Sequence, residues 1–258
     1  MLEDGFSVII KEVTKVSYWL LIPIVFFWCV ILFCSCQLVL CFVYCHMEKS
    51  RMAQNTSRVW GLPSKMTVSK KRRRKIKTEI KDYLYGLSRY VSIVIGKIPS
   101  HHIRKFLVKY ILCLDIHPKA VLYGGFELRS PWNIKIGKCV IGVGALLDGR
   151  MGIIIEDNVC FAQAVSVYTL QHDVNDDNFG TTDKGGAVLI KHHAWVSSKT
   201  TILPKCVVEV GAVIASGAIL TKSAEAYGIY GGLPARKIGE RKSPMMYDLN
   251  VEGYWHFF

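Results

Sequence analysis

An aliphatic side chain recurs at every sixth position in the C-terminal half of the chain. The column consists of Ile190, Val196, Ile202, Val208, Ile214 and Leu220. A second column, four residues after the first, holds small side chains: Ala194, Thr200, Cys206, Ala212, Ala218 and Ala224. Neither an α-helix nor a plain alternating strand keeps two such columns in step. A coil of three short strands does, because each face of the prism takes about six residues. The pattern therefore predicts a mainly β fold, a parallel β-helix of hexapeptide repeats with an aliphatic interior.

The spacing is less regular towards the N-terminal end of this repeat. We expect Ile136 to open it, although the next aliphatic corner, Ile141, follows after only five residues. Ile141, Leu147 and Ile153 are six apart, and a two-residue slip restarts the register at Ile155. Such slips are typical of an irregular first coil or of a bulge that faces a substrate.

A polar stretch interrupts the repeat from Leu170 to Ala187. An insertion into an otherwise strict repeat escapes the packing constraint, and loops held by a rigid scaffold are where chemistry tends to be located. The sequence therefore predicts that this loop carries functional residues.

An uncharged apolar run extends from Val16 to Tyr44. As a helix it would be roughly 40 Å long, which exceeds the ~30 Å hydrocarbon core of a bilayer. A cleaved signal peptide is the alternative, but its apolar region is usually only about 7–15 residues long, and no small-residue cleavage site follows here. We expect one transmembrane helix that acts as a membrane anchor.

The basic residues on the C-terminal side of the apolar run predict that the rest of the chain lies on the cytoplasmic side of the membrane. The formal net charge is +13, and the run Lys70–Lys75 after the apolar segment outweighs Lys11 and Lys15 before it. A nucleic-acid patch is the alternative for this run, but no interleaved aromatic ladder accompanies it. Attraction to anionic membrane lipid is simpler, and no nucleic-acid partner is expected. The nine cysteines show no C-x-x-C spacing, which favours a reduced, cytosol-facing protein.

Between anchor and β-helix the pattern changes twice. Met47 to Pro63 lacks periodicity and is expected to be a linker, whereas Val68 to Ile98 is periodic at three- and four-residue steps, and a short helix capped by Ser100 follows. The predicted segments are a membrane anchor 1–48 with its span at about 16–44, a basic linker with juxtamembrane helices 49–115, the β-helix 116–242 and an aromatic tail 243–258. The aromatic tail is expected to fold back onto the coil or onto a neighbouring subunit.

Four short motifs in the repeat resemble those of a known family. They are Ala194-Trp195-Val196, Ile202-Leu203-Pro204, Thr221-Lys222 and Gly231-Gly232-Leu233-Pro234-Ala235-Arg236. The chain from about His101 onwards resembles the hexapeptide-repeat acyltransferases of the galactoside, maltose and polysaccharide O-acetyltransferase type. The resemblance implies a left-handed coil, acetyl-CoA as co-substrate, and a homotrimer in which the loop and the donor groove come from adjacent chains.

Histidine is the residue type best suited to take a proton from a hydroxyl near neutral pH. In the family a histidine at the head of the inserted loop does this, and His172 matches that place. Its other ring nitrogen needs an acceptor, for which a loop carbonyl is favoured over Asp173, because adjacent side chains seldom converge. His192 and His193 occupy variable repeat positions and are expected on the surface or on a trimer face. The remaining histidines considered as bases are His101, His102, His117 and His256.

The resemblance also implies which residues hold the donor. By motif position they are Ser198, Ser216, Thr221, Lys222 and Arg236. Trp195 is a further candidate, to line the acyl end, with a packing role as the alternative. The chemistry agrees for Lys222 and Arg236, whose charges suit the phosphates of coenzyme A. Asp148 and Asp173 are the expected acceptor-binding residues.

We interpret the chain as a membrane-anchored O-acetyltransferase that moves acetyl from acetyl-CoA to a hydroxyl of a glycan, a sugar or a lipid-linked saccharide. Alternatives are a catalytically silent scaffold at the membrane and an N-acetyltransferase of an amino-sugar nucleotide. A zinc hydratase would need a different histidine geometry, so no metal is expected, and a Ser-His-Asp hydrolase lacks its glycine pattern. The acceptor itself is not readable from the sequence.

Overall fold

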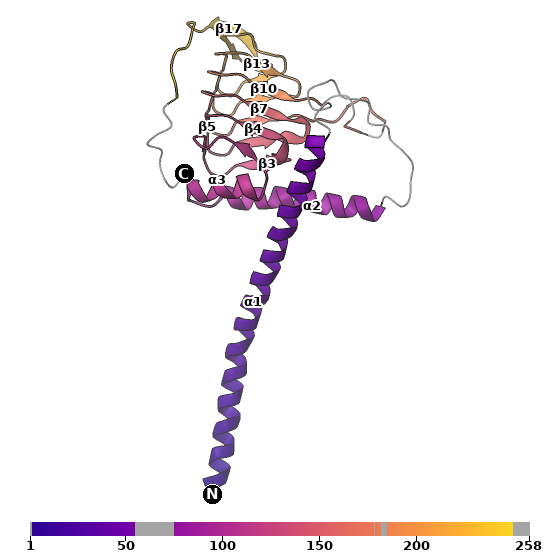
Figure 1. Ribbon diagram of the computed structural model, residues 1–258, viewed down its shortest axis with the longest axis vertical. Helices are drawn as coiled ribbons and strands as arrows, with labels where there is room; N and C mark the ends of the chain where they lie inside the picture. The colour runs from indigo at the N-terminus through magenta and orange to yellow at the C-terminus, as the bar shows by residue number, and fades with distance from the viewer. Residues whose placement is uncertain (1, 55–74, 178, 182–184, 250–258) are drawn as a thin grey trace. The chain divides into compact units, whose positions relative to one another are not determined.

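A computed structural model describes residues 2–54, 75–177, 179–181 and 185–249 (Figure 1). The chain divides into two compact units, Met1–Leu40 and Cys41–Phe258. The first consists of helix, and the second carries a parallel β-solenoid with helices at one end. The predicted fold class, a mainly β hexapeptide coil after one apolar helix and a helical segment, is confirmed.

Helix α1 (Leu2–Gln54) contains the predicted apolar run. Within the described residues, Val25–Gln54 is long and apolar enough to cross a membrane by length and composition, and its most apolar 18-residue window has a mean hydropathy of 2.5. The predicted linker is wrong in its first part, because Met47 to Gln54 is helical. The helix breakers of that stretch, from Asn55 to Pro63, all follow Gln54 and lie outside the described residues.

Two helices follow, as the periodicity predicted. Helix α2 (Lys75–Gly96) covers most of the expected stretch, of which residues 68–74 lie outside the described residues together with most of the basic run. Helix α3 (His101–Tyr110) begins after Ser100, whose hydroxyl accepts a hydrogen bond from the backbone N–H of Ile103 at 3.4 Å. The predicted N-cap is therefore confirmed.

Three sheets form the walls of the solenoid, and their strands alternate along the chain. Sheet A contains β1 (Asp115–Ile116), β4 (Ile134–Ile136), β7 (Ile153–Ile155), β10 (Val188–Ile190) and β13 (Val207–Val208). Sheet B contains β2 (Val121–Leu122), β5 (Val140–Ile141), β8 (Cys160–Phe161), β11 (Trp195–Val196), β14 (Val213–Ile214), β16 (Gly228–Gly231) and β17 (Arg236–Glu240). Sheet C contains β3 (Glu127–Arg129), β6 (Leu146–Asp148), β9 (Ser166–Val167), β12 (Thr201–Ile202) and β15 (Ile219–Leu220).

Five complete coils stack in parallel register, coil 1 being β1–β3 and coil 5 being β13–β15. Ile190 pairs with Ile155 on one side and with Val208 on the other, and all three side chains are buried. The small column is buried as well, and its Ala, Thr and Cys side chains leave room for the interior aliphatic groups. Among the strand pairs of the described residues, the β16–β17 hairpin, which closes the far end, is the antiparallel one.

The predicted start of the repeat at Ile136 is wrong, since coil 1 already begins at Asp115. Its interior residues Ile116, Leu122 and Leu128 are six apart and buried. The next step, from Leu128 to Ile136, takes eight residues because a short 3-10 helix intervenes.

Extra residues gather at one corner of the prism, between each sheet C strand and the following sheet A strand. We call it the C–A corner. Coil 1 carries η2 (Pro131–Asn133) there, coil 2 carries η3 (Gly149–Met151), and coil 3 carries the inserted loop 168–187. The predicted two-residue slip before Ile155 arises from η3, which adds residues at this corner of coil 2. The irregularities of the repeat therefore share one edge of the molecule.

The C-terminal segment folds back along the coil as far as the structure describes it. Asp248 pairs with Lys138 of coil 2, and the backbone N–H of Leu249 donates to Asn158 of coil 3 at 2.8 Å. The predicted contact of the terminal aromatics with the coil concerns residues 254–258, which lie outside the described residues.

Candidate active site

The ring of His172 is held by the backbone of its own loop. Its Nδ1 atom lies 2.7 Å from the carbonyl oxygen of Phe179, and the two rings stack with centroids 4.3 Å apart. A carbonyl accepts but never donates, so Nδ1 carries the hydrogen and Nε2 keeps a lone pair. The side chain is exposed, and in the neutral ring Nε2 is the atom that can accept a proton.

Backbone hydrogen bonds close the loop around this contact. The N–H of Asp173 donates to the carbonyl of Gly180 at 2.8 Å, and that of Phe179 donates to Asp176 at 2.8 Å. The Asp173 carboxylate accepts the N–H of Asn175 at 3.1 Å, as in an Asx turn. The Nδ1 atom of the imidazole is thus held by a loop carbonyl, which is the favoured arrangement.

Thr169 anchors the loop where it leaves sheet C. Its hydroxyl donates to the carbonyl of Asp148 at 2.6 Å and accepts from the N–H of Met151 at 2.9 Å. Gly149 allows η3 to pack this closely on coil 1, since a Cβ there would lie 2.8 Å from the carbonyl oxygen of Ser130. The loop base therefore rests on η3.

An ion pair at the same corner joins coil 2 to the loop. Arg150 donates from Nε to Oδ1 of Asp148 at 2.8 Å and from Nη2 to Oδ2 at 2.7 Å. The same Nη2 donates to the carbonyl of Leu170 at 3.3 Å. The hydrogen bonds to Asp148 raise the pKa of Arg150 above its usual range, so the guanidinium stays charged.

Asp148 is 0% exposed, and both carboxylate oxygens are bonded to Arg150. A direct contact between Asp148 and an acceptor, as the sequence predicted, does not fit this burial. Arg150 and Thr169 were missed, although their spacing from Asp148 and from the loop is visible in the sequence.

Two of the predicted donor residues meet at the corner between sheets B and C. Ser198 follows β11 and Ser216 follows β14, in successive coils. The N–H of Gly217 donates to the carbonyl of Ser198 at 2.9 Å, which stacks the two turns. At this edge of sheet C, Ser216 is exposed and Ser198 is half-buried.

Two others lie at the opposite edge of sheet C. Thr221 and Lys222 follow β15 at the C–A corner, and both are exposed. Arg236 opens β17, and the N–H of the preceding Ala235 donates to the carbonyl of Ile219 at 2.8 Å. The structure therefore places the predicted donor residues along both edges and the far end of sheet C.

Trp195 stands apart from this set. It lies on sheet B, between Cys160 and Val213 of the neighbouring coils, with 46% of its surface exposed. The structure does not bring Trp195 to sheet C. Within one chain it therefore lies away from the other predicted donor residues.

The paired histidines lie at a different corner, between sheets A and B. Their Nδ1 atoms are 2.9 Å apart, and Nε2 of His193 lies 2.7 Å from the carbonyl oxygen of Tyr247 in the C-terminal segment. Because that partner is a carbonyl, Nε2 is the donor. Within the part of the chain that the structure describes, no three His, Cys, Asp or Glu side chains are grouped to hold a metal ion.

The chain is similar to known acetyltransferases in part of its sequence and in its fold. No family model matches the chain. A chloramphenicol acetyltransferase of Klebsiella aerogenes is 36% identical over 120 residues, which cover 45% of this chain and 55% of that protein. One of Agrobacterium fabrum (strain C58 / ATCC 33970) is 37% identical over 70 residues, 27% of this chain and 34% of that protein. The chain thus spans about half the length of the first relative and a third of the second.

Solved structures give the same result for the fold. A hexapeptide-repeat acetyltransferase of Vibrio cholerae O1 biovar eltor, complexed with acetyl coenzyme A, has a TM-score of 0.56 at 19% identity, covering 64% of this chain and 90% of that one. The chain has the fold of the hexapeptide-repeat acetyltransferases. A maltose O-acetyltransferase from Clostridium difficile 630 has a TM-score of 0.52 at 19% identity, covering 62% and 89%. The hexapeptide-repeat resemblance predicted from four motifs is confirmed.

Proposed function

We propose that the chain is a membrane-anchored O-acetyltransferase that moves acetyl from acetyl-CoA to a hydroxyl of a glycan, a sugar or a lipid-linked saccharide. By their names, the proteins that resemble the chain are acetyltransferases, among them a chloramphenicol acetyltransferase and a maltose O-acetyltransferase, which supports the reaction class. The observation that carries the proposal is the orientation of His172, whose Nδ1 donates to Phe179 and whose Nε2 is left as a base.

His172 acts at the acceptor hydroxyl. Nε2 takes the hydroxyl proton while the oxygen forms its bond to the acetyl carbonyl carbon, because a sugar hydroxyl is barely ionised at neutral pH. The bond from that carbon to the thioester sulfur breaks, and the imidazolium returns the proton to the departing thiolate. The Phe179 carbonyl stabilises the imidazolium that exists between these transfers.

Sheet C and its far end hold the donor in this proposal. Lys222 and Arg236 are exposed cations that suit phosphates, and the backbone beside Ser198 and Ser216 is accessible to a pantetheine arm. Both acidic side chains expected to bind the acceptor have other partners here. We therefore assign Asp148 to positioning Arg150, and Asp173 to closing the loop.

A homotrimer completes the site. The 168–187 loop projects from the C–A corner, and the resemblance implies that the neighbouring chain supplies the donor groove to it. The apolar span in α1 anchors each chain in the membrane once, with the solenoid on the cytoplasmic side, where acetyl-CoA is made. The basic residues that follow α1 support this orientation.

The test is acetyl transfer by the full-length protein in nanodiscs. Acetyl-CoA and a panel of saccharide acceptors are supplied, thiol release is measured, and the acetyl position is read by mass spectrometry of the product. Wild-type protein is expected to release thiol only with an acceptor and to form a base-labile ester, and His172→Ala is expected not to.

Each alternative has its own signature in this assay. A base-stable acetyl on nitrogen identifies an N-acetyltransferase. Absence of both turnover and acetyl-CoA binding identifies a silent scaffold. Mass spectrometry of cellular glycan with and without the protein then identifies the acceptor.

A further inference from the structure

Helix α2 exposes an apolar stripe on the side that does not contact the solenoid. Ile80, Tyr83, Tyr90 and Val94 follow one another at three-, seven- and four-residue steps, which places them on one helix face. They are between 43% and 65% exposed. The opposite side, which includes Ser92, is buried against the coil.

Helix α3 repeats this arrangement over a shorter length. Ile103, Phe106 and Tyr110 are between 51% and 60% exposed, and the two aromatic rings lie 4.8 Å apart. Arg104 and Val108 on the other side are buried. Both helices therefore have a second apolar face in addition to the one that packs on the solenoid.

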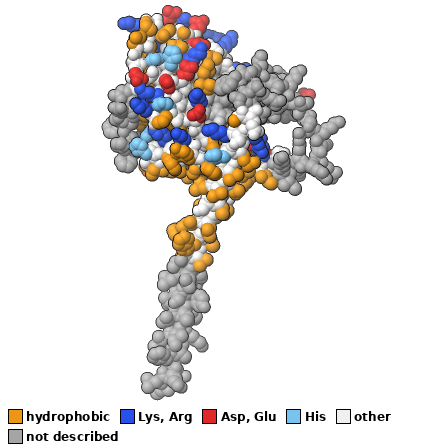
Figure 2. All heavy atoms as spheres, viewed as in Figure 1, with side chains coloured by type: hydrophobic (Ala, Val, Ile, Leu, Met, Phe, Trp, Pro, Cys, Tyr) orange, Lys and Arg blue, Asp and Glu red, His pale blue; other side chains and the backbone are white. Residues whose placement is uncertain are grey.

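These faces are held outward by polar contacts to coil 1. Arg89 of α2 pairs with Glu127 at 2.7 Å, and the hydroxyl of Ser92 donates to the carbonyl of Leu128 at 3.1 Å. Arg104 of α3 donates to the carbonyl of Leu122 at 3.3 Å. The two helices lie across the coil 1 end of the solenoid, and hydrophobic side chains gather along that edge of the surface (Figures 1 and 2).

The charge of this end is positive. Lys81, Lys97 and Lys109 are exposed on or beside the two helices. Against them α2 has only Glu79 and Asp82, near its N-terminal end, and α3 has no acidic residue. Tyrosine and phenylalanine interspersed with lysine are typical of surfaces that lie in the headgroup region of a bilayer.

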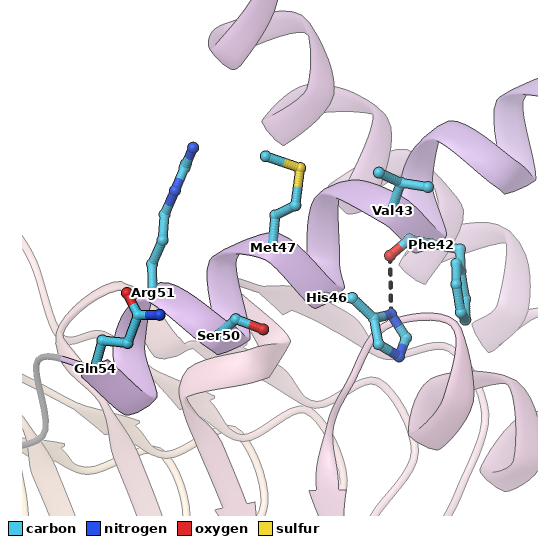
Figure 3. Close-up of a pocket in the computed structure, with 7 residues that line it drawn as sticks. All are labelled: Phe42, Val43, His46, Met47, Ser50, Arg51 and Gln54. Carbon is cyan, nitrogen blue, oxygen red and sulfur yellow. Dashed lines mark hydrogen bonds between the residues drawn. The ribbon is translucent and has the colours of Figure 1, made fainter.

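The chain itself brings a membrane within reach of this end. The apolar stretch Val25–Gln54 of α1 ends in Cys41–Gln54, which belongs to the second unit and packs on coil 1, where the rings of Tyr44 and Trp132 are 5.4 Å apart. The same segment exposes a shallow groove along one face, lined in part by Phe42, Val43 and Met47 (Figure 3). Apolar exposure thus continues from α1 to the end covered by α2 and α3.

We propose that the exposed face of α2 and α3 docks on the surface of an anionic bilayer, as a second membrane contact besides the α1 span. The side chains of Tyr90 and Phe106 enter the headgroup region, and the lysines contact lipid phosphates. Docking holds the coil 1 end against the lipid, where a lipid-borne acceptor is found. The inference rests on the membrane anchor of the proposed function, but not on acetyl transfer.

A photo-crosslinking amino acid tests this in the full-length protein. It replaces Tyr90 or Phe106, and in the control Ile238, which is 67% exposed on β17 at the other end of the solenoid. The protein is placed in nanodiscs with or without phosphatidylglycerol, irradiated and analysed for lipid adducts. Adducts are expected at positions 90 and 106, with more in the anionic discs, and none at 238.

Two results would overturn the proposal. Crosslinks from positions 90 and 106 to a second copy, seen as a dimer or trimer band, would make this face a protein interface. Equal lipid yield from positions 90, 106 and 238 would show that the face has no preference for lipid.

The lysines supply an independent test. Lys97→Gln/Lys109→Gln is expected to weaken docking in anionic discs roughly fivefold per residue and to have little effect in neutral ones. Lys199→Gln/Lys242→Gln, which changes the same charge far from this end, should leave the lipid yield unchanged. An equal effect of both pairs would contradict specific docking. Thiol release from a soluble acceptor, measured in parallel, reports separately on acetyl transfer.

Discussion

The Nδ1 atom of His172 lies 2.7 Å from the carbonyl oxygen of Phe179, seven residues further along the same loop, and the two rings stack at an angle of 6°. The hydrogen bond selects the tautomer and the stacking limits rotation of the imidazole. The loop therefore presents Nε2 in one orientation, which is what a general base requires.

Replacing the base tests this directly. His172→Ala is expected to lower turnover by about 10²–10⁴, because the hydroxyl proton then has no acceptor in the transition state. The Michaelis constant for acetyl-CoA should stay nearly unchanged, and the acidic limb of the turnover–pH profile should disappear. Steady-state kinetics at saturating donor measure all three.

His192→Ala and His193→Ala are the controls for this variant. Both residues lie at another corner of the prism, so each substitution is expected to lower turnover by less than about tenfold. Near wild-type turnover in folded His172→Ala protein would be falsifying, and would move the search for a base to this pair.

The loop also shows how far sequence reasoning reaches. The place of His172 and the choice of a carbonyl partner followed from the motif and from the geometry of adjacent side chains. The identity of Phe179 did not, because a loop without periodicity closes through local turns such as that of Asp173 with Gly180. Arg150 was overlooked for a related reason, since its partners lie in two different coils.

Removing Arg150 should affect both stability and rate. Arg150→Ala leaves the buried carboxylate of Asp148 without its partner, which is expected to cost about 1–3 kcal/mol of unfolding free energy. It also releases the carbonyl of Leu170 at the loop entrance. Turnover is expected to fall between about tenfold and 10²-fold through misplacement of the base.

A second variant separates these two effects. Asp148→Asn/Arg150→Met removes both charges, so it should recover much of the melting temperature but not the turnover. If the double variant recovers both the melting temperature and the turnover, Arg150 serves stability alone. If Arg150→Ala lowers neither quantity, the assignment is contradicted.

Replacing Lys222 or Arg236 with alanine should weaken donor binding more than the chemical step. The phosphates that they contact in the proposal are unchanged between ground and transition states, so the loss is one of uniform binding. The Michaelis constant for acetyl-CoA is expected to be higher in the variant than in the wild type. This difference between the two proteins should shrink with added salt. Lys119→Ala, an exposed lysine on coil 1, is the matched control. A large drop in turnover at saturating donor, with that constant unchanged, would count against the assignment.

Acid should weaken the contact of α3 with the solenoid. Burial is the main cause that lowers the pKa of His101 from its usual 6.5, and nearby Lys105 and Arg104 add to it. The unfolded chain therefore binds a proton at higher pH than the folded one. The stability that His101 contributes is complete above about pH 6.5 and falls as the pH drops towards its folded pKa. Melting temperatures of wild type and His101→Gln should converge with falling pH in this range. His102→Gln, an exposed neighbour, is the control, and a parallel pair of curves would contradict the prediction.

The interior columns made most of the fold predictable. Each coil admits one aliphatic side chain at a corner, so the six-residue period survives in the sequence wherever corners are tight. Coil 1 was not recognised because η2 lengthens the step after Leu128, and such corners follow no period. The end of α1 was missed for a different reason. Its polar last turns are helical because Tyr44 and Lys49 bind coil 1, by ring packing and by a hydrogen bond to the carbonyl of Cys113.

The proposed trimer places the loop of one chain over the donor groove of the next. Light scattering of the full-length protein in detergent should give the mass of three chains, and an active monomer would contradict it. A sharper test uses mixed oligomers made by co-expressing His172→Ala with Arg236→Ala, assayed at limiting acetyl-CoA. If His172 and Arg236 of one site belong to different chains, about a quarter of the sites in random mixtures carry both native residues.

Activity of the mixture should then exceed the average of the two separate variants. The gain requires subunit exchange during assembly, so the two variants purified separately and mixed after folding provide the control. If both residues of a site came from the same chain, no site in either preparation would be native, and the mixture would only average its components. Equal activity of the co-expressed and separately folded mixtures would therefore place the whole site within one chain.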